Sequence, residues 1–147
     1  MENRYLCKGR PVGTRKKWVI GFYAVLGEKT VIIEKEPAKY HDIEAGKSSC
    51  GNKIVEVMPE TVCRCAGSKD KNGKLIFEND IMEAHLVDIF PEVVTRECVV
   101  WHENGWCMSE PGCDDYGKLD DFYSENFEVI GNKIDNPELL EGNCDGE

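Results

Sequence analysis

The sequence predicts a mostly β fold with two parts, a small N-terminal β lobe and a C-terminal SH3-like barrel followed by a short helix. Short runs of β-branched and aromatic residues, separated by turn residues, favour antiparallel strands. From Leu75 onward, five such runs are joined by tight turns, as a small SH3-like barrel requires. The chain has 147 residues, the length of one domain. We therefore expect a single domain with a lobe over 1–66, a barrel portion over 67–142 and a flexible tail over 143–147.

The N-terminal lobe is expected to contain four strands. A hairpin is indicated by the apolar run 18–26, the turn Gly27-Glu28-Lys29 and the β-branched run 30–34. Residues 53–58 alternate between polar and apolar side chains, which is the period of a half-buried strand. After Pro59, a further strand is expected over 61–66.

The C-terminal portion is rich in residues that favour turns. The pair Asn72-Gly73 is typical of a tight reversal in which two residues have positive φ, and Asn79 tolerates a left-handed backbone. A second hairpin is expected to turn at 103–105, with a tryptophan on either side that packs the core or caps the turn. The expected strands are 75–77, 80–87, 96–101, 106–109 and 127–134.

The end of the chain shows the signature of a short helix. Asn136 suits the N-cap, Pro137 the first helical position and Gly142 the stop. The acidic segment 109–121 is expected to be a loop because it carries Pro111 and two glycines.

Charge is distributed unevenly along the chain, whose net charge is −10. Residues 1–35 carry a net +5, residues 36–110 a net −6 and residues 111–147 a net −9. A strongly acidic region repels a phosphate backbone, so direct DNA binding is disfavoured. The simplest interpretation is that this charge keeps the protein soluble.

Four carboxylates in the acidic segment, Asp114, Asp115, Asp120 and Asp121, are the candidate partner-binding residues. Their oxygens could also hold a divalent cation, but their spacing matches no calcium loop, which favours a solvated acidic loop. A partner that approaches this segment should be basic and steered by charge.

The chain contains eight cysteines, at positions 7, 50, 63, 65, 98, 107, 113 and 144. No pair has the C-x-x-C spacing of a structural zinc site, and a cytosolic chain would keep its thiols reduced. We expect mostly structural thiols. The alternative is a zinc site that Cys63 and Cys65 form with Cys107 or Cys113.

No sequence signature of catalysis or cofactor binding is found. The basic turn Arg15-Lys16-Lys17 beside Trp18 could contact phosphate, although a solvated loop before a strand is the simpler interpretation. The chain begins without the apolar core of a signal peptide, and its apolar runs are too short to span a bilayer. A protein without enzymatic activity or cofactor, located in the cytoplasm and away from membranes, is expected.

The motif GSKDKNGKLIFENDI at 67–81 resembles the YopX family of phage and prophage proteins. That family has the pattern Gly-x-Lys-Asp-Lys-Asn-Gly-Lys-x-Ile-Tyr/Phe-Glu-Gly-Asp-Ile, from which this chain departs chiefly at Asn79. The resemblance continues in the opening elements Lys8-Gly9-Arg10 and 18–21, in 57–62 and in the closing stretch 127–140. It therefore covers nearly the whole chain.

This resemblance implies a mostly β fold with an SH3-like barrel, encoded by a phage or prophage, and no established activity. The shared residues look like fold determinants, because Asn72-Gly73 and Asn79-Asp80 suit turns. We expect a non-enzymatic accessory protein that acts through contacts with a phage or host protein in the bacterial cytoplasm. Exposed strand edges would also allow a homo-oligomer. The alternatives are an acidic mimic of nucleic acid that inhibits a host defence nuclease or another nucleic-acid-binding protein, and a metal-assisted hydrolase.

Overall fold

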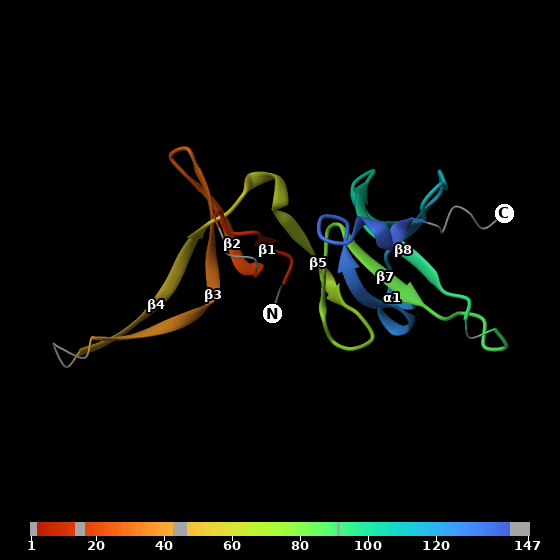
Figure 1. The fold of residues 1–147 in the computed structure, drawn as a ribbon, viewed down its shortest axis with the longest axis horizontal. Coiled ribbons are helices and arrows are strands. Elements are labelled where there is room, and N and C mark those ends of the chain that lie inside the picture. The colour runs from red at the N-terminus through yellow and green to blue at the C-terminus, as the bar shows by residue number, and fades with distance from the viewer. Residues whose placement is uncertain (1–2, 14–16, 43–46, 91, 142–147) are drawn as a thin grey trace. The chain divides into compact units, whose positions relative to one another are not determined.

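The computed structural model describes residues 3–13, 17–42, 47–90 and 92–141, and it confirms a mostly β fold with 52% strand and 11% helix. The chain divides into two compact units. One comprises Tyr5–Arg64 and is called the N-terminal unit. The other comprises Met1–Arg4 with Cys65–Glu147 and is called the C-terminal unit (Figure 1).

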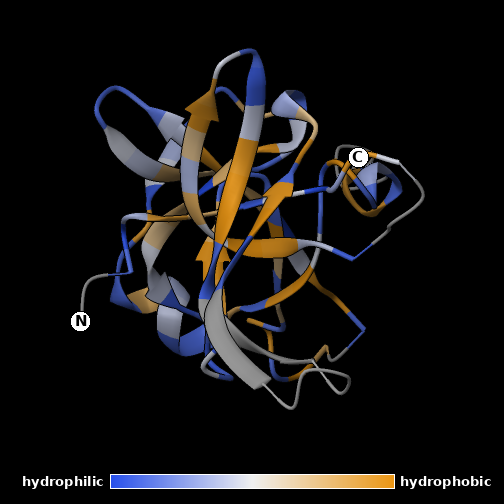
Figure 2. Ribbon diagram, turned by 90° about the vertical axis from the view of Figure 1, so that its left-hand side faces the viewer, coloured by the Kyte–Doolittle hydropathy of each residue, from blue (hydrophilic) through white to orange (hydrophobic). Residues whose placement is uncertain are grey.

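Antiparallel strands in the order β4-β3-β2-β1-β5 build the N-terminal unit. These strands are β1 (Leu6–Gly9), β2 (Val19–Leu26), β3 (Lys29–Asp42), β4 (Lys47–Glu56) and the first residues of β5 (Cys63–Lys69). A 3-10 turn, η1 (Pro59–Thr61), precedes β5. Figure 2 shows hydrophobic stretches of the strands in orange and the hydrophilic residues of the turns in blue.

The main core cluster of the N-terminal unit lies on one face of its sheet, and Leu6 and Val31 are buried on the other. Its buried members are Cys7, Val19, Ile32, Val55 and Val57, with Val62 packed against them. The chain after β1 also bonds to the end of β4, because the amide of Val12 donates to the Glu56 carbonyl at 3.1 Å and the amide of Met58 to the Arg10 carbonyl at 2.8 Å. These two hydrogen bonds lie on either side of the bridge between Pro11 and Val57 and tie the segment after β1 to the chain that follows β4.

A second antiparallel sheet, in the order β10-β9-β8-β7-β11, builds the C-terminal unit. Its elements are β7 (Asp80–Ala84), β8 (Thr95–His102), β9 (Gly105–Ser109), β10 (Tyr116–Lys118), α1 (Asp121–Asn126), β11 (Glu128–Asn132) and the 3-10 helix η2 (Pro137–Leu140), while β6 (Leu75–Phe77) pairs with β5. The sheet has β10 and β11 as its outer strands, so strand pairing does not close it into the expected barrel. Its buried core consists of Ile76, Met82, Ala84, Val99, Met108 and Phe127.

Asp70 organises the reversal that the Asn72-Gly73 pair predicts. Its Oδ1 accepts hydrogen bonds from the amides of Asn72 and Lys74, both at 2.9 Å, and its Oδ2 accepts one from the amide of Val129 at 2.9 Å. The reversal is confirmed, but the expectation of two positive φ angles is wrong, because only Gly73 adopts one, at +83°. The carboxylate of Asp70 supplies the acceptors that hold Asn72 in ordinary backbone geometry.

Two other turns follow the predicted chemistry. Asn79 has a φ of 72°, as expected, and the buried carboxylate of Asp80 accepts a hydrogen bond from the Phe77 amide at 2.8 Å. Between β8 and β9, Glu103 and Asn104 both have positive φ, at 48° and 69°. This is the backbone pattern of a two-residue hairpin turn.

Several element boundaries differ from the predictions. The strand expected over 80–87 ends at Ala84, and the segment expected to be a loop over 109–121 contains β10 and the start of α1. The final helix is a 3-10 helix without a side-chain cap, because Asn136 Oδ1 accepts from the Asn132 amide instead. The expected stop at Gly142 and the tail lie outside the described residues. No helix among the described residues is long and apolar enough to cross a membrane.

Candidate functional site

The two units differ strongly in charge. The N-terminal unit contains 11 Lys and Arg against 7 Asp and Glu, a net charge of +4. The C-terminal unit contains 7 against 21, a net charge of −14. The opposite signs follow the structural division of the chain, so a surface that attracts cationic groups is expected on the C-terminal unit.

The four aspartates predicted to bind a partner flank β10 and begin α1. Asp114 and Asp115 are exposed on the segment before β10, and Asp121 is exposed in the first turn of α1. Asp120 caps α1, where its Oδ1 accepts a hydrogen bond from the Phe122 amide at 3.1 Å. An N-cap carboxylate is favourable because the first amides of a helix lack partners, so Asp120 also has a structural role.

Two further carboxylates, Glu97 on β8 and Glu110 after β9, join this region. The Tyr123 hydroxyl of α1 donates a hydrogen bond to Glu97 Oε1 at 3.2 Å. Burial raises the pKa of Glu97, the hydrogen bond from Tyr123 lowers it, and the negative charge of Glu110 raises it again. The predicted hairpin contained a signal for this proximity, because the pairing of Cys98 with Ser109 brings their chain neighbours Glu97 and Glu110 to the same end of the β8–β9 ladder.

The pKa of Tyr123 shows how the negative charges combine. Burial is the first cause of its rise to about 12, followed by the charge and hydrogen bond of Glu97 and the charges of Asp120 and Glu110. The phenol therefore stays neutral well above the pH at which a free tyrosine ionises.

The pKa of the Cys113 thiol is raised by several of the same negative charges. Loss of hydration is the first cause of its raised pKa, followed by the charges of Glu110, Asp115 and Asp114. Cys113 is exposed, and because its pKa is raised, the thiol stays protonated and neutral within an acidic surface. We define the acidic surface by the carboxylates that perturb Tyr123 or Cys113: Glu97, Glu110, Asp114, Asp115 and Asp120. Asp121 is not among the causes of either shift.

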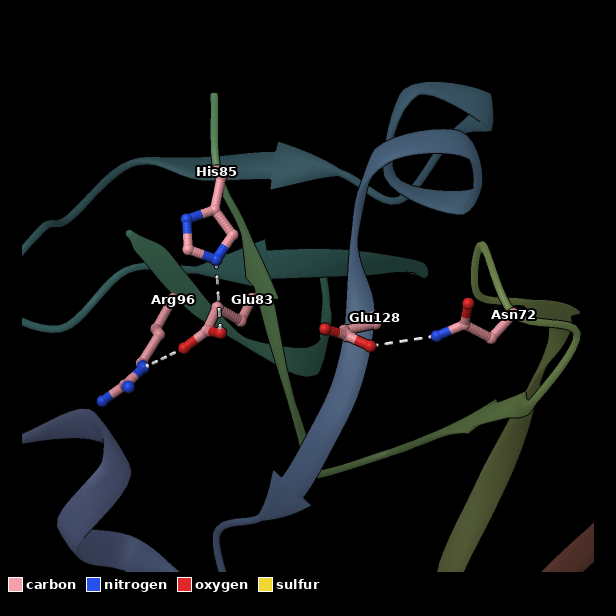
Figure 3. Close-up of polar contacts among 5 residues, drawn as sticks. All are labelled: Asn72, Glu83, His85, Arg96 and Glu128. Carbon is pink, nitrogen blue, oxygen red and sulfur yellow. Dashed lines mark hydrogen bonds and ion pairs between the residues drawn. The ribbon is translucent and has the colours of Figure 1, made fainter. Parts of the chain in front are cut away.

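Other carboxylates in the C-terminal unit have close structural partners. Figure 3 shows Glu83 between Arg96, whose Nε donates to Oε2 at 2.7 Å, and His85, whose Nε2 lies 4.0 Å from Oε1. The side-chain amide of Asn72 donates from Nδ2 to Glu128 Oε2 at 2.9 Å (Figure 3). These contacts join neighbouring elements of the fold, whereas the acidic surface concentrates like charges.

The cysteines considered for zinc lie in different surroundings. Cys63 and Cys65 are buried on β5, where the Cys63 thiol donates to the Thr61 carbonyl at 3.3 Å and the Cys65 sulfur accepts from the Gly67 amide at 3.4 Å. The thiol of Cys107 faces the carbonyl of His102 at 3.8 Å, and Cys113 is exposed.

Within the described ranges, no group of three or more His, Cys, Asp or Glu residues is placed to hold a metal ion. Cys7 and Cys98, which were not considered for zinc, are also buried. The side chains of Cys50 and Cys144 lie outside the part of the chain that the structure describes.

The predicted basic and aromatic patch is only partly described, because Arg15 and Lys16 lie outside the described residues. Trp18 is half-buried, and two cations of the same unit lie over its ring, Lys8 Nζ at 4.8 Å and Arg10 Cζ at 5.3 Å from the centroid. These cation–π contacts give Trp18 a structural role in the N-terminal unit.

Comparison with known proteins gives one family. A family model described as YopX protein matches residues 24–141, which is most of the chain. No curated protein matches the sequence.

Proposed function

This chain belongs to the YopX family, and we propose that it is a non-enzymatic phage or prophage accessory protein that acts through protein contacts in the bacterial host. The observation that carries the proposal is the separation of charge, a net −14 in the C-terminal unit against +4 in the N-terminal unit. The partner we propose is a basic protein that binds the acidic surface.

Electrostatics supports this choice of surface. The carboxylates of the acidic surface raise the pKa values of Tyr123 and Cys113, so their charges reinforce one another at a common place. Such a field steers a cationic partner and raises its association rate, and dissolved salt screens it over about 8 Å at physiological ionic strength.

A salt-series capture experiment tests the proposal. Host lysate is passed over the full chain and over D114N/D115N/D120N/D121N, and bound proteins are identified by mass spectrometry. Asparagine is also a good N-cap, so the change at Asp120 preserves the start of α1. We expect a basic protein to bind the wild type, to be lost steeply as salt rises and to bind the variant at least tenfold less.

A matched control neutralises the same number of charges elsewhere. The variant E28Q/E60Q/E138Q/E141Q changes four exposed glutamates outside the acidic surface and gives the same net charge. It should capture the partner as the wild type does. Equal capture by all three proteins at every salt concentration would contradict a binding role for the acidic surface.

A second candidate function is mimicry of nucleic acid, favoured by the gathering of carboxylates from β8, from the segment after β9 and from the start of α1. In this case the captured partner is a nucleic-acid-binding protein, for example a host defence nuclease. Duplex DNA should then compete with the wild-type chain for the partner. A partner that binds the acidic surface and DNA simultaneously would exclude mimicry.

A further inference from the structure

An apolar loop lies between β7 and β8 in the C-terminal unit. It exposes five large hydrophobic side chains, of which Ile89 is 80% and Phe90 51% accessible; the others are Leu86, Val87 and Val93. Two successive turns shape the loop, with the Phe90 amide donating to the Val87 carbonyl at 3.1 Å and the Val93 amide to the Phe90 carbonyl at 3.0 Å. Clusters of this kind on a surface mark contact sites.

The N-terminal unit carries a second apolar surface, on the sheet face opposite its core cluster; Leu6 and Val31 are buried on this face, and other apolar residues of it are exposed. Phe22 on β2 lies directly opposite Ile33 on β3, which lies directly opposite Ile54 on β4. Directly opposed residues share a face, and Ile20 shares it because it lies two residues from Phe22. Phe22 is 42% and Ile54 55% accessible. We call these four residues the apolar face.

The charges that flank the two surfaces are opposite in sign. The apolar loop contains the exposed acidic residues Asp88 and Glu92 and belongs to the unit with net charge −14. Two lysines and one glutamate share the face of these apolar residues in the unit with net charge +4: Lys8 lies directly opposite Ile20, and Lys29 pairs with Glu56 at 3.9 Å. An apolar centre within a rim of complementary charge is the usual composition of a protein interface.

We propose that the apolar loop of one copy of this chain binds the apolar face of a second copy. Contact between two loops would bring acidic residues together, and contact between two apolar faces would bring two basic units together, so pairing unlike surfaces is electrostatically preferred. Each copy carries both surfaces. Two reciprocal contacts form a closed two-fold dimer, whereas single contacts from copy to copy form an open linear assembly. The acidic surface is not part of the proposed contact.

Charge introduced into each surface tests the proposal by sedimentation of the full chain. F22E/I54E places acidic groups on the apolar face, and I89K/F90K places basic groups on the apolar loop. We expect the wild type to self-associate and each variant alone to associate at least tenfold more weakly. An equimolar mixture should regain association, because the acidic face of one variant attracts the basic loop of the other.

Controls separate surface effects from general charge effects. Y23E/V25E changes exposed residues that alternate with Phe22 along β2, and F122K/I134K changes exposed residues outside the apolar loop. Both should self-associate like the wild type, as should D114N/D115N/D120N/D121N, which tests the acidic surface separately. Thermal unfolding checks that each variant folds, and F22A/I54A and I89A/F90A replace any charged variant that does not.

Three results would each overturn the proposal. They are a wild-type chain that stays monomeric at the highest soluble concentration, a folded loop or face variant that associates as strongly as the wild type, and a mixture of the two charged variants that does not associate. The last result, with both single variants monomeric, would indicate that the surfaces do not bind each other.

Discussion

The two units of this protein use charge in different ways. In the N-terminal unit, the packed residues are mainly apolar and two cations lie over the half-buried Trp18. In the C-terminal unit, carboxylates serve two purposes: Asp70 and Asp80 are buried and accept backbone hydrogen bonds, while the acidic surface is formed mostly by exposed residues. The carboxylates that give the C-terminal unit its negative charge therefore fall into two groups, one that holds the fold and one that lies on the surface.

Hydrogen bonding separates the two kinds of carboxylate. Asp70 accepts three backbone amides, which compensate its loss of hydration. Glu97 accepts one hydroxyl, and its pKa is raised by burial and by Glu110. Removing Asp70 should destabilise the fold, whereas removing an exposed carboxylate of the acidic surface that caps no helix, such as Asp114, should not.

The largest effect should come from Asp70→Ala in the C-terminal unit. The change leaves the amides of Asn72, Lys74 and Val129 without their acceptor, at a cost of roughly 4 kcal/mol in the free energy of unfolding. Chemical denaturation measures the loss, and hydrogen exchange should show it at these amides. Asp114→Ala, on the exposed surface, is the control and should change stability by less than about 0.5 kcal/mol. Equal losses would remove the distinction between the two kinds of carboxylate.

Gly21→Ala is the corresponding test in the N-terminal unit. A Cβ at Gly21 would overlap the carbonyl of Ile33 on the neighbouring strand, so the β2–β3 ladder must shift, at a cost of roughly 2–3 kcal/mol. Gly105→Ala in the C-terminal unit is the control, because nothing lies within 4 Å of a Cβ there. Thermal unfolding should show a clear loss of stability for Gly21→Ala only. An unchanged melting temperature for this variant would disprove the close approach of Gly21 to the Ile33 carbonyl.

Gly73→Val should have an intermediate effect, about 1 kcal/mol or somewhat more. Gly73 has a φ of +83° with nothing within 4 Å of a Cβ, so the cost comes from backbone strain alone. Asn is more tolerant of this conformation, and Gly73→Asn should recover most of the loss. Denaturant unfolding compares the two variants. A valine variant that loses partner binding at unchanged stability would show that the turn itself contacts the partner.

The smallest effect on stability is expected for Glu97→Gln. Glutamine keeps an acceptor for the Tyr123 hydroxyl but removes the repulsion of Glu110, so the free energy of unfolding at neutral pH should rise by about 0.3–0.5 kcal/mol. The pKa of Tyr123, raised to about 12 in the wild type, should fall toward its usual value of 10.0. NMR titration of the Tyr123 ring measures this change, with Glu92→Gln as the control.

The pH dependence of stability has a definite sign. Tyr123 keeps its proton longer in the folded chain than in the unfolded chain, so its contribution is complete below pH 10 and is lost as the pH rises through about 12. In Glu97→Gln, this alkaline loss should move to lower pH. An unchanged alkaline profile would contradict the assignment of Glu97 as a major charge acting on Tyr123.

Much of the fold could be predicted from local sequence patterns. The hairpin of β8 and β9, the left-handed residue at Asn79 and the reversal before Lys74 depend on turn residues whose backbone preferences act over a few positions. The end of β7 at Ala84 could not be predicted in this way, because the apolar residues that follow resemble a strand and are instead exposed in a loop. Likewise, β10 and α1 lie in a segment whose composition is typical of a loop.

The sequence by itself determined the antiparallel β class, the chief turns and the excess of negative charge toward the C-terminus, because propensities and net charge are properties of short segments. Only the tertiary structure decided that Glu97 and Glu110 join the aspartates beside Tyr123, and that Phe22, Ile33 and Ile54 share one face of the sheet, on which Phe22 and Ile54 are exposed. These groupings depend on strand register and on the packing of residues far apart in the chain. The exact register of β2, β3 and β4 and the contact of α1 with β8 set them, and turn signals and residue propensities fix neither.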